Sequence, residues 1–126
     1  MKFQPDRPTG LSVTAYSDTW IAIDGIRYPH SLIIGSNGTV VEWPEVRWHE
    51  FGKTHLALIT DTGAEIVLIG CAQKQDRPEM LTLIPLMEKG IGTEIMDTAA
   101  ACRTYNVLAA EGRRVAAVLM LSSSTR

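Results

Sequence analysis

The stretch that decides the fold is GIGTEIMDTAAACRTYNVLAAEGRRVAAVLM, residues 90–120. Near its start, residues 93–96 read as a short strand, and Asp97 and Thr98 follow, two residue types that favour the N-cap position of a helix. The alanine-rich segment after them ends at a glycine, which commonly terminates helices, so we expect a helix over 98–111. The apolar residues 114–121 then predict a buried strand, which makes the whole stretch a strand, a helix and a second strand.

The sequence immediately upstream extends this pattern. Residues 65–70, EIVLIG, form a continuous apolar run ended by glycine, as in a strand buried on both faces of a sheet. Pro78 suits the first turn of a helix that Gly90 ends, and Pro85 should bend or shorten that helix. Residues 65–121 therefore read as βαβαβ, whose right-handed crossovers place the strands in one sheet with helices packed on it.

The first part of the chain has a different composition. Seven of the eight aromatic residues lie within the first 51 positions, and turn signals such as Asp24-Gly25 separate short β-branched and aromatic runs. We expect an antiparallel meander within residues 11–43, with strands near 11–16, 19–23, 26–34 and 39–43. Residues 54–60 fit a short helix but also fit a strand. The predicted fold is an α/β domain in three layers, with a mixed central sheet and an N-terminal antiparallel β-layer.

Length and charge limit the classes of protein. A length of 126 residues predicts one domain spanning 1–126, and we expect residues 122–126 to be a disordered tail. The net charge is −2 without a basic cluster, so no nucleic-acid partner is predicted. The longest apolar run, residues 115–121, is far shorter than the roughly 20 residues that span a bilayer, so no membrane span is predicted. We expect the protein to be cytoplasmic.

The sequence lacks the motifs of the common enzyme classes. Cys71 and Cys102 are too far apart for a C-x-x-C pair, and three scattered histidines give no metal-ligand spacing. No dinucleotide fingerprint, phosphate loop, zinc-protease motif or nucleophile elbow is present. We therefore predict no metal, no cofactor and no catalytic residues.

One edge of the predicted sheet is a candidate ligand site. If the strands that end near residues 70 and 96 are parallel, their carboxyl ends gather polar and small residues at the place where α/β sheets bind ligands. A helix N-terminus lies there, so an anionic ligand is the expected guest. The candidate ligand-binding residues are Gly70, Cys71, Asp97, Thr98, Arg103 and Asn106.

These residues also have plain structural roles to fill. Asp97 is expected to be an N-cap, and Arg103 is expected to pair with Asp97 or Glu94. Asn106 either lines a cavity on its helix face or holds backbone near the last strand.

The run MDTAAACRTYNVL, residues 96–108, resembles the signature of a family of small domains of unknown function. That family includes mitochondrial respiratory complex I assembly factor 3 and an adipogenesis-associated relative. The resemblance extends to residues 23–34, to Trp43-Pro44 and to residues 65–70. It implies a three-layer fold with a mixed sheet and, from the animal members, a role in assembling respiratory complex I or in cell differentiation, without implying a reaction. The chain departs from the family at Gly70-Cys71-Ala72, where Gly-Thr-Gly is usual.

Two functions from different classes follow. The first is a non-catalytic domain that binds another protein or assists assembly, with Trp20, Trp43 and Trp48 as the candidate interaction surface, because aromatic residues are enriched at interfaces. The second is a small-molecule binding protein or enzyme that uses the pocket near Cys71, Asp97 and Arg103. An exposed apolar patch favours the first function, and a deep pocket favours the second.

Overall fold

The computed structural model describes residues 11–43 and 53–122. Trp48 lies outside this part, and so do residues 123–126 of the predicted tail. The elements, in chain order, are β1 (Val13–Tyr16), β2 (Ile21–Ile23), β3 (Ile26–Tyr28), β4 (Ser31–Gly35), β5 (Val40–Trp43), α1 (Lys53–Asp61), β6 (Ile66–Cys71), the 3-10 turn η3 (Lys74–Asp76), α2 (Met80–Glu88), β7 (Gly92–Asp97), α3 (Thr98–Ala110) and β8 (Val115–Leu119).

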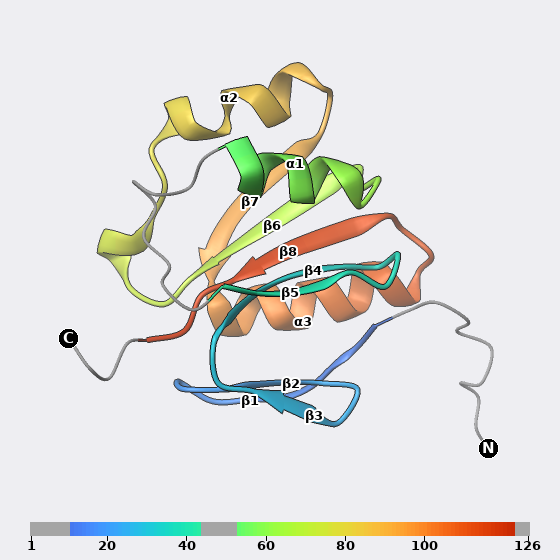
Figure 1. The fold of residues 1–126 in the computed structure, drawn as a ribbon, viewed down its shortest axis with the longest axis vertical. Coiled ribbons are helices and arrows are strands. Elements are labelled where there is room, and N and C mark those ends of the chain that lie inside the picture. Colours follow the sequence, from blue (N-terminus) through green and yellow to red (C-terminus); the bar gives the residue numbers. More distant parts are fainter. Residues whose placement is uncertain (1–10, 44–52, 123–126) are drawn as a thin grey trace.

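The strands form two sheets. A small antiparallel sheet has the order β1-β2-β3, and a central mixed sheet has the order β5-β4-β8-β6-β7 (Figure 1). Strand β6 is parallel to both β7 and β8, while β4 runs antiparallel to β5 and β8. The predicted α/β class with a mixed central sheet, a βαβαβ C-terminal half and an N-terminal antiparallel layer is confirmed. Residues 54–60 are helical, which settles the alternative left open by the sequence.

The prediction of one strand over 26–34 is wrong. This segment forms β3 and β4, which are separated at Pro29 and His30 and belong to different sheets. Proline has no N–H to donate to a ladder, so the chain leaves the small sheet there. All five residues of β4 are buried, as a strand covered on both faces requires. The second β-layer is therefore limited to β1–β3, and β4 and β5 extend the central sheet.

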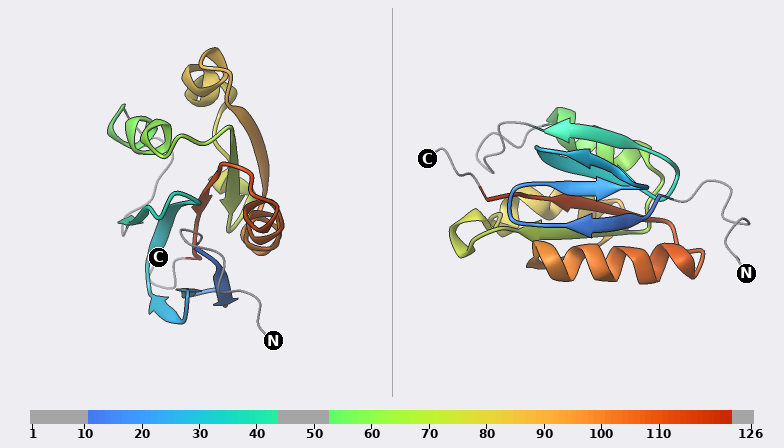
Figure 2. Two further views of the ribbon diagram at one scale, coloured as in Figure 1. Left: turned by 90° about the vertical axis from the view of Figure 1, so that its right-hand side faces the viewer. Right: turned by 90° about the horizontal axis from the view of Figure 1, so that it is seen from below.

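The central sheet separates two apolar cores. Helices α1 and α2 cover one face, and α3 with the small sheet covers the other (Figure 2). Alternate residues of each strand enter opposite cores: Ile33 and Val118 face α1 and α2, while Leu32 and Leu119 face α3 and the small sheet. This alternation explains why the central strands are apolar at every position.

Helix α3 follows β7 without a loop. Asp97 ends the strand and also caps the helix, and the helix ends before Gly112, whose φ of +83° is a conformation that favours glycine. Residues Ala101, Cys102 and Tyr105 form its buried face against the sheet. This direct strand-to-helix junction fixes the N-terminus of α3 at the carboxyl end of the sheet.

Candidate functional site

The carboxyl ends of β6 and β7 meet as the sequence predicted. The two strands are parallel, and their register pairs Gly70 with Met96 and Cys71 with Asp97. Strand β8 lies on the other side of β6, and the N–H of Met120 donates to the carbonyl of Gly70 at 3.0 Å. The carboxyl ends of three parallel strands and the N-terminus of α3 therefore lie together at the same end of the sheet.

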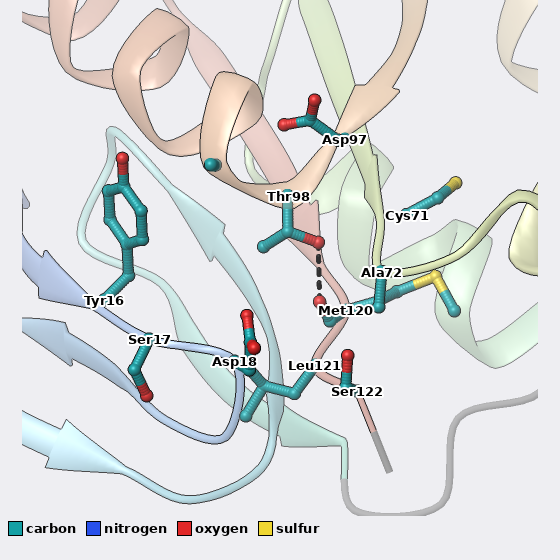
Figure 3. Close-up of a pocket in the computed structure, with 11 residues that line it drawn as sticks. Tyr16, Ser17, Asp18, Cys71, Ala72, Asp97, Thr98, Met120, Leu121 and Ser122 are labelled. Atoms are coloured by element: carbon teal, nitrogen blue, oxygen red, sulfur yellow. Dashed lines mark hydrogen bonds between the residues drawn. The ribbon is translucent and has the colours of Figure 1, made fainter.

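A pocket of about 360 Å³ lies between this edge and the turn that joins β1 to β2 (Figure 3). The N–H of Ser122 donates to the carbonyl of Asp18 at 3.1 Å, which holds that turn against the segment that follows β8. The lining residues are Tyr16, Ser17, Asp18, Cys71, Ala72, Asp97, Thr98, Ala99, Met120, Leu121 and Ser122. The pocket therefore includes three of the six predicted ligand-binding residues, namely Cys71, Asp97 and Thr98.

Asp97 and Thr98 both have structural hydrogen bonds in the pocket wall. Asp97 Oδ1 accepts from the N–H of Ala100 at 2.7 Å, which is the N-cap interaction predicted for it. Such a cap stabilises a helix by about 0.5–2 kcal/mol. The hydroxyl of Thr98 donates to the carbonyl of Met120 at 2.6 Å and so ties α3 to β8.

Gly70 is buried and contacts the helix rather than the pocket. A Cβ atom added at Gly70 would lie 2.9 Å from Cβ of Ala101 and 3.0 Å from Cα of Thr98. Glycine is therefore required for the close approach of α3 to β6. This packing role explains why Gly70 does not line the pocket.

Arg103 does not make the predicted pair with Asp97 or Glu94. Its Nη1 instead donates to the hydroxyl of Tyr16 at 3.1 Å, from an exposed position on α3. Arg103 does not line the pocket, whose charged lining residues are Asp18 and Asp97. The carboxylates disfavour the anionic guest that the helix N-terminus alone suggested.

Asn106 also has a different partner from the predicted one. Its side-chain amide donates to the carbonyl of Val13 at 2.8 Å and accepts from the N–H of Val13 at 2.9 Å. The amide therefore binds the backbone of β1, not backbone near the last strand, and it does not line the pocket. This pair of bonds joins residues 93 apart in the chain, which sequence periodicity does not reveal.

The two thiols lie in unreactive surroundings. Burial raises the pKa of Cys71 to about 11, and burial likewise raises the pKa of Cys102 to about 11. The thiol of Cys71 donates to the carbonyl of Asp76 at 3.6 Å. Both groups are protonated at neutral pH, so neither is an activated nucleophile. Within residues 11–43 and 53–122 no cluster of three His, Cys, Asp or Glu residues has metal-ligand geometry.

The two described tryptophans of the predicted interaction surface differ in how far they are buried. Trp20 is half-buried beside the small sheet, and the guanidinium of Arg27 lies over its ring at 3.9 Å from the centroid. Trp43 is only 7% exposed and packs in the core beside the ring of His55, so it does not form part of a surface. Of the two described tryptophans, Trp20 alone is accessible to a partner.

An exposed apolar surface that was not predicted lies on α2. Leu83 and Leu86 are buried, but Met80, Leu81 and Met87 are 62%, 75% and 42% exposed. The signal was present in the sequence, because MLTLIPLME carries large apolar residues on every side of the helix. A helix packed on one side of a sheet cannot bury all of them. We call Met80, Leu81 and Met87 the α2 face.

The fold places the protein among the Mth938-like domains. The solution structure of a Bordetella pertussis protein described as a Mth938-like domain has a TM-score of 0.76 and 30% sequence identity, over 95% of this chain and 92% of that one. Residues 13–120 match the family described as "Protein of unknown function (DUF498/DUF598)", and the chain belongs to that family.

Two of the curated relatives carry different names. NADH dehydrogenase [ubiquinone] 1 alpha subcomplex assembly factor 3 of Bos taurus is 28% identical over 121 residues, covering 93% of this chain but only 64% of that longer protein. The 13 kDa major membrane protein of Francisella tularensis is 33% identical over 95 residues, covering 74% of this chain and 76% of that protein. In the described part of this chain, none of the helices is long and apolar enough to cross a membrane.

Proposed function

We propose that this protein is a non-catalytic domain that binds another protein and assists its assembly into a complex. The observation that carries this proposal is the α2 face, where Leu81 is 75% and Met80 62% exposed. Exposure of neighbouring large apolar side chains is typical of a surface that a partner covers. The name of the bovine relative, an assembly factor, supports the same class of function.

The pocket does not supply a competing catalytic arrangement. Two of its lining residues, Asp97 and Thr98, make hydrogen bonds that hold the start of α3 in place. A third, Cys71, has a thiol with a raised pKa. Nucleophilic catalysis by a cysteine needs the thiolate, and the raised pKa keeps the Cys71 thiol protonated at neutral pH.

The test places a photo-crosslinking amino acid at position 81, with position 107 as the control. Val107 is 55% exposed on α3, which lies on the opposite face of the central sheet. We expect position 81 to capture one defined protein in the native cells and position 107 to capture none. The captured protein is then purified, and Leu81→Gln should weaken its binding while Val107→Gln should not. Equal capture from both positions, or binding unchanged by Leu81→Gln, contradicts the proposal.

Trp20 stays in the proposal as a second contact. It lies beside the small sheet, and Ile26 of the same sheet is 60% exposed. The cytoplasmic location also stays a proposal, because the Francisella relative is named a membrane protein. Fractionation of the native cells, with the chain recovered from the soluble or the membrane fraction, decides the location.

Small-ligand binding is the second candidate function, and the pocket supports it. A volume of about 360 Å³ falls within the roughly 300–1,000 Å³ of ligand sites. Because Asp18 and Asp97 line the pocket, we propose a neutral or cationic ligand in place of the anionic one. A ligand screen by thermal shift tests this, with Ala72→Leu narrowing the pocket. If a ligand raises the melting temperature of Ala72→Leu as much as that of the unchanged protein, the pocket is not its binding site.

A further inference from the structure

Strand β7 forms an open edge of the central sheet. It is the last strand in the order β5-β4-β8-β6-β7, so its backbone pairs with β6 on one side only. The N–H of Gly92 donates to the carbonyl of Glu65 at 2.9 Å, on the β6 side. Because backbone groups alternate in direction along a strand, those of Thr93 and Ile95 point away from β6. No strand of the described chain pairs with them.

This edge lacks most features that protect edge strands from pairing. It is six residues long, and its register with β6 runs without a shift from Gly92 to Asp97. The sequence GTEIMD contains neither proline nor lysine. Native proteins usually protect such an edge with prolines, bulges, charges or a short length. Its remaining protection is the charge of Glu94 and Asp97, both exposed.

We propose that the open edge of β7 binds an extended, basic segment of a partner protein as an additional strand. An extended segment satisfies the outward backbone groups of Thr93 and Ile95 with main-chain hydrogen bonds. The strand has two carboxylates and no cation, so a segment carrying Lys or Arg is complementary in charge. A second copy of β7 would instead bring four carboxylates into one pair of strands, which is unfavourable.

The two faces of β7 also set the pattern of the segment. Ile95 packs into the core beneath α1 and α2, while Met96 packs into the core beneath α3, so Glu94 lies on the α3 side. Basic residues of the segment should lie on the side of Glu94, and apolar ones on the side of Ile95. Helix α2 lies at the β7 end of the sheet (Figure 2). The inference rests on the proposed function, because it specifies how the partner is recognised.

The experiment uses the full chain, labelled with ¹⁵N, and two peptides that alternate valine with lysine or valine with glutamate. We expect the lysine peptide to slow amide hydrogen exchange at Thr93 and Ile95, whose N–H groups face the opening. Glu94, whose N–H faces β6, should change little. The variant Glu94→Lys should weaken binding of the lysine peptide by on the order of tenfold and strengthen binding of the glutamate peptide.

The matched control is Glu42→Lys. Glu42 is an exposed acid on β5, the edge strand at the other end of the same sheet. The variant Glu42→Lys changes the net charge by the same amount as Glu94→Lys but lies far from β7 in the strand order. The affinity for the lysine peptide should therefore fall much less in Glu42→Lys than in Glu94→Lys. Dispersed spectra of both variants establish that they fold.

Three results would overturn the inference. They are equal binding of both peptides, protection away from β7, and a dimer in analytical ultracentrifugation with Thr93 protected before any peptide is added. The proposed function fails separately, through the crosslinking experiment at Leu81. If position 81 crosslinks to a partner but the lysine peptide does not slow amide exchange in β7, then only the inference about strand pairing at β7 is overturned, and the proposed function stands.

Discussion

Replacing Asn106 by alanine should loosen the small sheet from α3. The side-chain amide makes two hydrogen bonds with the backbone of Val13, at 2.8 and 2.9 Å, and Val13 is only 6% exposed. Removing the amide leaves a buried N–H and a buried carbonyl unpaired, each at a cost of about 1–3 kcal/mol. Asn106 is half-buried, so water can reach the site and the lower end of that range applies.

The net loss of unfolding free energy follows from two terms. Two unpaired groups at about 1 kcal/mol each give about 2 kcal/mol, and the higher helix propensity of alanine returns up to about 0.7 kcal/mol. We therefore expect Asn106→Ala to lower the free energy of unfolding by about 1–2 kcal/mol in guanidinium denaturation. Val107→Ala is the control, since Val107 neighbours Asn106 on α3 and is 55% exposed.

Hydrogen exchange gives the more specific readout of the same change. The N–H of Val13 donates to Asn106 Oδ1, so its exchange should accelerate in Asn106→Ala. Exchange at Leu68 in the middle of the central sheet should change only as far as global stability does. The reasoning is refuted if Val13 exchanges at its original rate and the free energy of unfolding changes by no more than in Val107→Ala.

Two further predictions concern packing and pH. Gly70→Ala should destabilise the protein by about 1–3 kcal/mol in chemical denaturation, because its Cβ would lie 2.9 Å from Cβ of Ala101; an unchanged midpoint would mean that α3 moves away without cost. The free energy of unfolding should fall as the pH rises from about 9 to about 11, because the pKa of Cys71 and that of Cys102 are raised to about 11 in the folded state, so the unfolded thiols ionise first. The double variant Cys71→Ala/Cys102→Ala should show a shallower fall, and an identical slope in both proteins would contradict the raised pKa values.

The C-terminal half of the fold was predictable because its signals are local. The apolar runs at 66–71 and 115–119, and the cap at Asp97, each report on a few consecutive residues. Their arrangement then follows from the handedness of βαβ connections. The split at Pro29 was missed because β-propensity does not reveal to which sheet a strand belongs.

The candidate site was predictable only where strand ends determine it. Cys71 and Asp97 come together because each ends a parallel strand of the same sheet. The partners of Arg103 and Asn106 were not predictable, because each bonds to the first strand, about 90 residues away in sequence. Which side of an evenly apolar helix such as α2 faces solvent depends on the packing of the finished fold, which periodicity does not contain.

The edge strands of the small sheet are protected from pairing with another chain, unlike the edge strand β7 of the central sheet. The outer edge of β1 is closed at Val13, where the amide of Asn106 pairs with both backbone groups as a neighbouring strand would. Strand β3, at the other end of that sheet, is only three residues long, which leaves little backbone for another chain to pair with. Strand β7 is six residues long and has neither protection. Since this same chain protects two shorter edges, we expect the longer edge of β7 to be covered in the assembled state, and slow exchange of Thr93 in the complex with the crosslinked partner would show it.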